Sequence, residues 1–203
     1  MRQLIEDGLR YFQVQYNEQV IADIAYYVEE LEKWNRHVNL TGLKSAEAVV
    51  TVLLYDAFFV NRLIKGDRII LDLGSGAGIL AIPLKILNSG MSVISVDKNT
   101  KKIQFQRHIA RRLHLKDFTA LQGKIEELDA MEVDALLVKA FGGMEMIFEK
   151  GGRHIRHGGR AMMLKTERDE PVDAAGFVLE ETIPYRLPLG EKALRIFIYK
   201  KIS

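Results

Sequence analysis

The 203-residue chain contains no cysteine. It therefore forms no disulfide, holds no thiolate zinc site or iron–sulfur cluster, and uses no cysteine nucleophile. The chain has only four prolines, and 48% of its residues are hydrophobic. This composition is not typical of disordered or fibrous chains. Length and composition together predict one globular unit with a small extension, and the missing cysteines favour a reducing cytosol.

The chain also lacks an excess of charge of one sign and a long apolar run. It has 29 Lys plus Arg and 27 Asp plus Glu, a net charge of +2, so any interaction with nucleic acid depends on where the positive charges lie. Residues 1–13 carry acids and lack the apolar core of a signal peptide. Asp56 and Arg62 interrupt the longest apolar stretch, residues 48–64, which is shorter than the roughly 20 residues that span a bilayer. We expect a cytoplasmic protein with no membrane contact.

The first third of the sequence is predicted to be helical. From a start near Asn17, apolar residues recur at intervals of three and four, as in an amphipathic helix. Ser45 can cap a second helix. Its apolar positions are Val49, Val52, Leu53, Phe59, Val60 and Leu63. The turn at Gly66 and Asp67 ends this part, so the predicted units are a helical extension, 1–66, and a second domain, 67–203.

Short aliphatic runs then alternate with helical stretches. The predicted strands are residues 69–73, 93–96, 118–121, 135–138 and 161–164. This alternation predicts an α/β fold with a mostly parallel sheet covered on both faces. Two further strand-like runs, 176–185 and 193–200, are joined only by residues 186–192, which favours a hairpin and an antiparallel edge.

A glycine-rich loop follows the first predicted strand. Gly74, Gly76 and Gly78 let the backbone turn tightly and approach a ligand closely, between the strand 69–73 and a helix beginning near Leu80. This is typical of nucleotide cradles. The pattern is only moderately specific, because residues 76–81 also satisfy the dinucleotide motif.

Two acids lie at predicted strand ends beside this loop. Asp72 is positioned to accept from a ligand amine or bound water, where the phosphate of NAD would be disfavoured. Asp97 ends the second strand, where an acid can accept from ribose hydroxyls. The structural alternatives are that Asp72 caps the following helix and that Asp97 is a turn residue.

Residues 123–127 follow the third strand. In this position Ile125 is expected to lie against an adenine ring while a neighbouring polar group reads its edge. Alternatively, the segment is an acid-rich helix start that the helix dipole favours.

Together these motifs resemble the class I S-adenosylmethionine methyltransferases, and within them the ribosomal RNA small subunit methyltransferase G family. The matching segments are Trp34-Asn35 with residues 39–41, Asp56, residues 72–78, 82–84, 125–127, Ala140-Phe141 and Leu164-Lys165. The resemblance runs from about residue 20 to the C-terminus. It implies a Rossmann-like seven-stranded sheet with a helical extension, S-adenosyl-L-methionine as cofactor, and N7 methylation of a guanine in 16S rRNA of the small ribosomal subunit.

By matching position, the resemblance implies that Gly74, Ile79, Ile125, Glu126 and Lys139 contact the cofactor, with Asp97 near the ribose. The chain departs from the family elsewhere. Val52, Leu53 and Ala57 replace the family's Arg, His and Ser around Asp56, and Lys139 replaces an Arg. The nearest candidates for a C-terminal family Arg are Lys192 and Arg195. The alternatives left open are therefore a divergent methyltransferase with another acceptor and a non-catalytic nucleotide or NAD-binding module.

Methyl transfer from a sulfonium is an in-line displacement that requires alignment and exclusion of water. Because guanine N7 has a lone pair and no proton to lose, we expect neither a general base nor a metal. Lys139, at the end of the fourth predicted strand, is expected to orient the substrate. The resemblance implies that Asn39 and Asp56 also belong to the catalytic site. The alternatives are a Lys139 that pairs Asp72 or Asp97, and an Asn39 that serves only as a turn between helices.

Two groups of cations are candidates for contacting the RNA backbone; the alternative is that both are solvated faces. The first comprises Lys98, Lys101, Lys102, Arg107, Arg111, Arg112, His114 and Lys116, and the second Arg153, His154, Arg156, His157 and Arg160. Binding through them would weaken steeply with salt. Trp34, Met162 and Met163 are predicted to be core residues, and the chain is expected to be a monomer.

Overall fold

The computed structural model describes residues 1–43, 45–188 and 193–203. The N-terminal part contains α1 (Arg2–Tyr11), α2 (Glu18–Val38), α3 (Ala46–Ala48), the π-helical turn η1 (Val49–Leu54) and α4 (Tyr55–Leu63). The first half of the sheet region contains β1 (Ile69–Leu73), α5 (Ala81–Leu87), β2 (Ser92–Asp97), α6 (Thr100–Arg112), β3 (Phe118–Gln122), the 3-10 turn η2 (Ile125–Glu127) and β4 (Val133–Lys139). The chain continues with α7 (Met144–Gly151), the 3-10 turn η3 (Gly152–His154), β5 (Ile155–Thr166), β6 (Phe177–Arg186) and β7 (Ala193–Lys201). Lys192 lies outside the described residues.

The helix starts expected from the sequence are confirmed. The Asn17 side chain accepts from the amide of Val20 at 2.9 Å, and Ser45 Oγ accepts from the amide of Ala48 at 3.2 Å. One expectation fails within the second helix, which contains the π-helical turn η1. A π turn holds more residues than an α turn and shifts the helix face. Val52, expected on the apolar face, is therefore 48% exposed.

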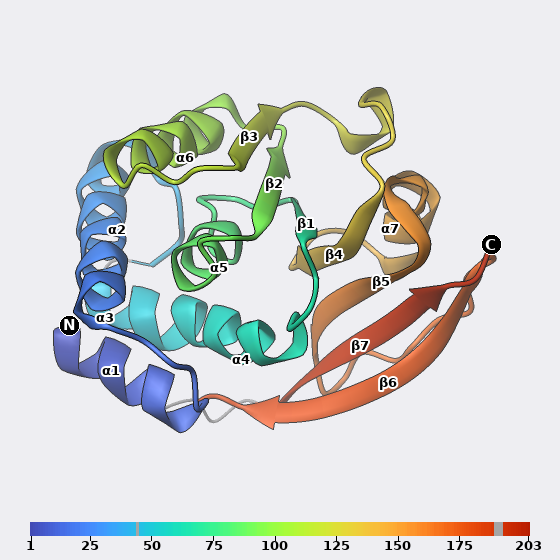
Figure 1. Cartoon of the computed structure of the whole chain (residues 1–203), viewed down its shortest axis with the longest axis horizontal. Coiled ribbons are helices and arrows are strands. Elements are labelled where there is room, and N and C mark those ends of the chain that lie inside the picture. Colours follow the sequence, from blue (N-terminus) through green and yellow to red (C-terminus); the bar gives the residue numbers. More distant parts are fainter. Residues whose placement is uncertain (44, 189–192) are drawn as a thin grey trace.

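Seven strands form one sheet with the order β3-β2-β1-β4-β5-β7-β6 (Figure 1). Strands β1 to β5 are parallel, and β7 pairs antiparallel with both β5 and β6. The predicted α/β class and the antiparallel C-terminal hairpin are thus confirmed, with β7 inserted inside the sheet and β6 at its edge. The strand order reverses between β1 and β4, which is where open α/β sheets bind ligands.

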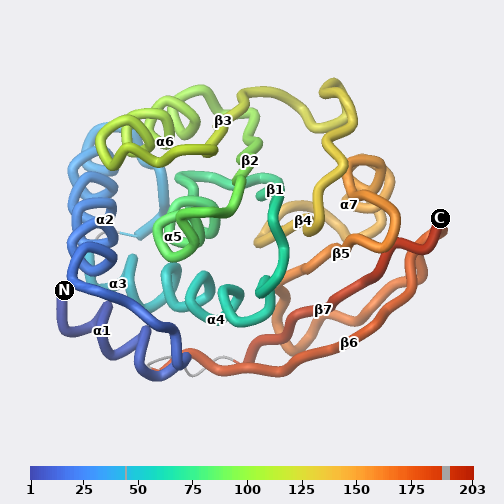
Figure 2. Tube along the Cα trace, in the orientation of Figure 1, coloured from blue at the N-terminus to red at the C-terminus, as the bar shows by residue number. Residues whose placement is uncertain are grey.

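Alternate residues of the strands belong to two hydrophobic cores. Ile70 and Met162 pack into a core with α1, α2, α4, α5 and α6, while Leu71 and Met163 pack on the other face with α7. Figure 2 shows the same division, with α7 on the opposite side of the sheet from α2 and α5. Helices therefore cover both faces, as predicted. Met162 and Met163 are fully buried core residues, as expected.

The N-terminal helices share the first of these cores with the sheet. Ile5 and Leu31 belong to the same buried cluster as Ile70 and Ile196. Trp34 packs edge-on against Phe105 of α6, with ring centroids 5.5 Å apart. The boundary expected at residues 66 and 67 falls in the turn between α4 and β1. Among the described residues, none of the helices is long and apolar enough to cross a membrane.

Candidate functional site

Three adjoining clefts open at the carboxyl end of the parallel strands. The β2 cleft, about 610 Å³, lies between the end of β2, η2 and the start of α7. The loop cleft, about 290 Å³, lies over the glycine loop, residues 74–78. The α4 cleft, about 270 Å³, lies between α4, β4, β5 and β6. Ala140 lines all three, and Lys139 lines both the loop cleft and the α4 cleft.

Strand register brings most of the predicted site residues to this edge. Leu73 of β1 pairs with Val96 of β2 and with Val138 of β4, so Asp72, Asp97 and Lys139 end neighbouring strands. Gly74, Asp97, Ile125 and Glu126 line the β2 cleft. Asp72, Gly74, Gly76, Ile79 and Lys139 line the loop cleft, and Asp56 and Lys139 line the α4 cleft.

The three loop glycines serve different purposes, although each has a positive φ angle. At Gly76, φ is +60°, and an added Cβ would point into open space whose nearest group is Lys102 Nζ at 3.9 Å. At Gly74 a Cβ would lie 2.4 Å from the ring of Phe141, and at Gly78 it would lie 2.7 Å from Ile82. Gly76 therefore keeps the cleft open, whereas Gly74 and Gly78 permit close packing.

A buried glutamine that the sequence reasoning missed is hydrogen-bonded to the glycine loop from α6. Gln106 Nε2 donates to Ser75 Oγ at 2.9 Å and to the carbonyl of Gly76 at 2.8 Å, and its Oε1 accepts from Ser95 Oγ at 2.5 Å. Gln106 is fully buried on the apolar face of α6. A polar residue in an apolar helical stripe, beside Ile103 and Ile109, was the available signal.

Asp72 is buried beneath the loop and caps α5. Its exposed fraction is 2%, and its Oδ2 accepts from the amide of Ala81 at 3.1 Å. The capping alternative is therefore seen in the structure, while the carboxylate also lines the loop cleft. The pKa of Asp72 is raised to about 7, chiefly by burial and also by the charge of Asp97. The Ala81 hydrogen bond and the Lys139 charge oppose this rise.

The surroundings of Asp97 are compatible with both predictions for it, a turn residue and an acceptor for a ligand. Its Oδ2 accepts from the amide of Gly76 at 2.9 Å and its Oδ1 accepts from the amide of Asn99 at 2.8 Å. It thus fixes the turn after β2 and still lines the β2 cleft. Each carboxylate oxygen has a second lone pair, so acceptor capacity toward a ligand remains.

The far wall of the β2 cleft is the turn η2. Ile125 is 2% exposed there, while Glu126 forms an ion pair of 2.9 Å with Lys150, which holds the pKa of the Glu126 carboxyl below its usual range. Arg153 donates to the carbonyl oxygens of Glu126 and Leu128. The acid-rich helix start, given as the alternative for this segment, is seen as a single 3-10 turn.

Lys139 pairs with a carboxylate that the sequence reasoning placed beside it but did not pair with it. Its Nζ lies 2.6 Å from Asp56 Oδ2, so the expected alternatives of pairing with Asp72 or Asp97 were wrong. Asp56 is 3% exposed, and its Oδ1 accepts from the hydroxyl of Tyr185 at 2.7 Å. Among the described residues, Asp56 is the one recorded ion-pair partner of Lys139, whose Nζ is buried.

Asn39 is not among the residues that line the three clefts. Asn39 ends α2 with a left-handed φ of +44° and is exposed, whereas the adjacent Leu40 and Thr41 line the loop cleft. Its turn alternative is what the structure shows. Asn35, one of the residues that carry the family resemblance, holds this turn, because its Nδ2 donates to the carbonyl of Leu43 at 2.6 Å and its Oδ1 accepts from the amide of Thr41 at 2.8 Å.

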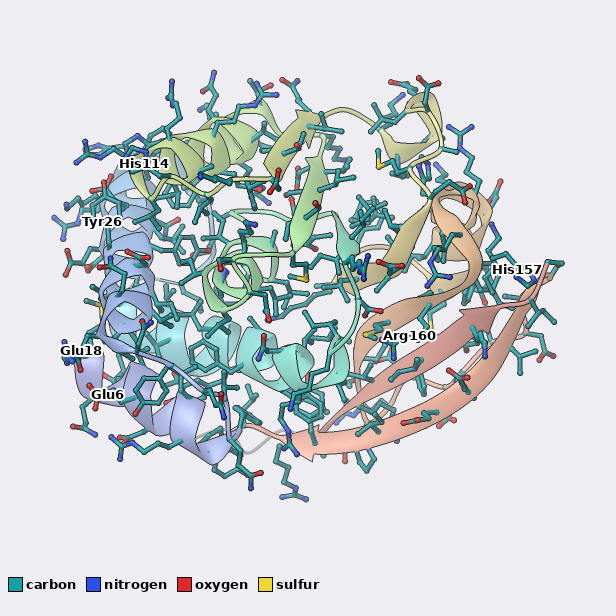
Figure 3. All side chains as sticks on the ribbon, in the orientation of Figure 1. Glu6, Glu18, Tyr26, His114, His157 and Arg160 are labelled. Atoms are coloured by element: carbon teal, nitrogen blue, oxygen red, sulfur yellow. The ribbon has the colours of Figure 1, made fainter. Side chains whose placement is uncertain are left out.

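Three cations of the second cluster are paired or buried. Arg156 pairs with Asp134 at 2.6 Å, Arg160 pairs with Asp67 at 2.8 Å, and His154 is fully buried. Arg156 and Arg160 lie in the amino-terminal half of β5, and Figure 3 shows Arg160 beside the long C-terminal strands. His154 precedes β5 and contacts the carbonyl of Ile125 in η2. The ion pairs with Asp134 and Asp67 explain the positions of Arg156 and Arg160 better than RNA contact does.

The first cluster divides along α6. Arg107 donates to the carbonyl of Ala120, and Arg112 donates to the hydroxyl of Tyr26 at 3.0 Å. Figure 3 shows Tyr26 and His114 together at the outer rim, away from the strands. Lys98, Lys101 and Lys102 lie instead at the amino-terminal end of the helix, next to the end of β2. Within the residues that the structure describes, no cluster of three or more His, Asp or Glu side chains could hold a metal ion.

The strand order, the glycine loop between β1 and α5 and the acid ending β2 define a Rossmann-like methyltransferase fold. An O-methyltransferase from Bacillus cereus, solved in complex with SAH, has the same architecture, with a TM-score of 0.61 and 17% identity over 87% of this chain and 91% of that one. The model of the family GidB, rRNA small subunit methyltransferase G, matches residues 20–175. The chain belongs to this family.

Full-length relatives agree with this assignment. The chain is 33% identical over 188 residues to "Ribosomal RNA small subunit methyltransferase G" of Geotalea uraniireducens, covering 87% of this chain and 86% of the relative. It is 32% identical over 197 residues to the protein of the same name from Syntrophotalea carbinolica, covering 91% of each. A SAM-dependent methyltransferase structure from Aquifex aeolicus shares the fold, with a TM-score of 0.58 and 14% identity over 85% of this chain and 96% of that one.

Proposed function

We propose that this chain is an S-adenosylmethionine-dependent methyltransferase that methylates N7 of a guanine in 16S rRNA of the small ribosomal subunit. Family membership supports this reaction. The structural observation that carries it is that the loop cleft and the α4 cleft meet at Lys139 and Ala140. A cofactor in the first and a base in the second would face each other across this border.

The residues of the first two clefts fit S-adenosylmethionine. The open space at Gly76 is a cradle that a Cβ would enter, and the carboxylates of Asp97 and Glu126 can accept from ribose and adenine groups. Ile125 supplies apolar surface for the adenine ring. Asp72 and Ile79 line the adjoining loop cleft, where the methionine part would lie. When bound, the cofactor supplies the electrophilic methyl group.

The α4 cleft contains groups suited to orient a guanine. N7 and O6 are both acceptors on the same edge of the base. Lys139 Nζ is buried and contacts Asp56 Oδ2, and an ammonium has three N–H donors. A remaining N–H can donate to O6, which would hold the neighbouring N7 toward the loop cleft. The ion pair with Asp56 holds this ammonium in place. No proton is lost from N7, so these residues need only position the base and exclude water.

Lysines at the mouth of the clefts are suited to the RNA backbone. Lys98, Lys102 and Lys124 line the β2 cleft, and Lys101 lies exposed beside them. We assign RNA contact to this group and not to the paired arginines of β5. A cytoplasmic monomer is part of the proposal, and light scattering of the purified protein tests its oligomeric state.

The proposal has a direct biochemical test that separates it from the two alternatives. Purified protein is incubated with methyl-labelled S-adenosylmethionine and unmethylated small subunits, free 16S rRNA or, as a control, 23S rRNA. Label on one guanine N7 of 16S rRNA is the expected result. Binding of S-adenosylmethionine without transfer to 16S rRNA would favour another acceptor. Thermal stabilisation by NAD and not by S-adenosylmethionine or S-adenosylhomocysteine would favour a dinucleotide-binding module.

A further inference from the structure

We infer that Tyr185 is a positioning residue for methyl transfer, which acts by holding the Asp56 carboxylate and, through it, the Lys139 ammonium. The inference rests on the proposed function. Tyr185 is near the end of β6, at the sheet edge, and its hydroxyl donates to Asp56 Oδ1 at 2.7 Å. The other oxygen, Oδ2, lies 2.6 Å from Lys139 Nζ. One carboxylate thus joins three elements, α4, β4 and β6.

The position of the Tyr185 ring is itself fixed by packing. Phe59, one turn after Asp56 in α4, stacks on it with centroids 4.2 Å apart and an interplanar angle of 20°. Tyr185 is 8% exposed. Figure 1 shows the end of β6 passing below α4, which is how a residue so late in the chain reaches this helix. Ring and hydroxyl are therefore held from two sides.

The hydrogen bond determines where the Asp56 charge points. A buried carboxylate with one neutral donor and one cation has a single favourable orientation, since turning it would leave a buried oxygen without a partner. Without the phenol, Oδ1 is free to turn toward Lys139. The ammonium would then be drawn into a symmetric pair with both oxygens and away from an acceptor base. Tyr185 thus preserves the donor capacity of Lys139.

Tyr185 also remains a donor over the whole useful pH range. Burial and the Asp56 charge raise the pKa of the Tyr185 hydroxyl, so it stays protonated. Around it, the α4 cleft is lined by Asp56, Lys139, Lys165 and Asp169 as the charged groups. Tyr185 therefore holds Asp56, and through it Lys139, with a hydroxyl that does not titrate near neutral pH.

The test compares Tyr185→Phe with wild type in single-turnover methyl transfer at saturating S-adenosylmethionine and 16S rRNA substrate. Phenylalanine keeps the stacking on Phe59 and removes only the hydroxyl. We expect the transfer rate to fall about tenfold, the usual size of a lost hydrogen bond to a charged group. The dissociation constants of cofactor and RNA should change less than about twofold. Tyr199→Phe is the matched control, because it removes a phenol hydrogen bond to Val172 outside the three clefts and should transfer at the wild-type rate.

A double-mutant cycle with Asp56→Asn shows whether Tyr185 acts through Asp56. In the Asp56→Asn background, adding Tyr185→Phe should lower the rate less than about twofold. A wild-type rate for Tyr185→Phe, or losses that multiply independently, would overturn the inference while leaving the proposed function intact. A wild-type protein that binds S-adenosylmethionine but transfers nothing to 16S rRNA would overturn the proposed function, and the inference with it.

Discussion

The ammonium of Lys139 lies 2.6 Å from the carboxylate of Asp56, so the end of β4 is tied to a helix that precedes the sheet in sequence. This ion pair lies on the border between the loop cleft and the α4 cleft. The N-terminal helices therefore line the α4 cleft as well as covering the sheet.

Replacing Lys139 by methionine should lower single-turnover methyl transfer by about ten- to a hundredfold. The substitution keeps most of the side-chain volume but removes the donor to the base, and it leaves Asp56 without its cation. Lys139→Arg is the matched variant, because a guanidinium also pairs with a carboxylate and donates, and it should keep most of the activity. An active Lys139→Met protein would contradict the proposed role.

Asp72 should make the folded protein less stable as pH rises from about 4 to about 7. Burial holds its pKa at about 7 in the folded state, so over this range the folded protein keeps a proton that the unfolded chain loses. Asp72→Asn removes this dependence and preserves an acceptor for the amide of Ala81. Its free energy of unfolding at pH 8 should exceed that of wild type by at most on the order of 4 kcal/mol. Urea unfolding at pH 5 and pH 8 measures both values.

The same variant should bind S-adenosylmethionine at least about tenfold more weakly, because the loop cleft loses its buried carboxylate. Gain of stability with loss of binding is typical of functional residues. Equal pH dependence of stability in wild type and Asp72→Asn would show that Asp72 is not the titrating group.

Gly76→Ala should abolish binding of S-adenosylmethionine without unfolding the protein. The added methyl enters the open space of the loop cleft, and the positive φ angle costs about 1 to 2 kcal/mol. Gly66→Ala is the control, since Gly66 also has a positive φ angle, +96°, and open space around it, but lies in the turn before β1. Isothermal titration with the cofactor distinguishes them. Wild-type affinity in Gly76→Ala would place the ligand elsewhere.

Lys101→Ala should weaken RNA binding and lower the slope of log K against log salt concentration by about one. Arg156→Ala provides the comparison, because Arg156 pairs with Asp134 at the opposite edge of the sheet. It should leave the RNA affinity and its salt slope unchanged. Filter binding at several salt concentrations measures both variants, and an equal loss in the two would show that the contacts are not confined to the cleft edge.

The sheet was predictable because its signals are local. Aliphatic runs such as residues 69–73 and the glycines at 74, 76 and 78 mark a buried strand and a tight turn without knowledge of distant residues. Asp72 and Asp97 were predicted from their places at strand ends, and other cofactor residues came from the family resemblance. Parallel register then brought them to one edge, as the strand order required.

The acceptor side depends on contacts that are distant in sequence. Tyr185 meets Asp56 across 129 positions, and no periodicity indicates such a pair. The π-helical turn η1 that shifts the face of Val52 is an irregularity of backbone hydrogen bonding, which side-chain spacing does not reveal. Asn39 was assigned to the site through the family resemblance, whereas it is exposed with a left-handed φ angle, and the nearby Thr41 lines the loop cleft.

The most direct test of the account is mass mapping of 16S rRNA from a strain in which this gene is deleted. The account predicts that a single N7-methylguanosine is lost, that the wild-type gene restores it, and that the Lys139→Met gene does not. An unchanged content of N7-methylguanosine in 16S rRNA of the deletion strain would contradict it.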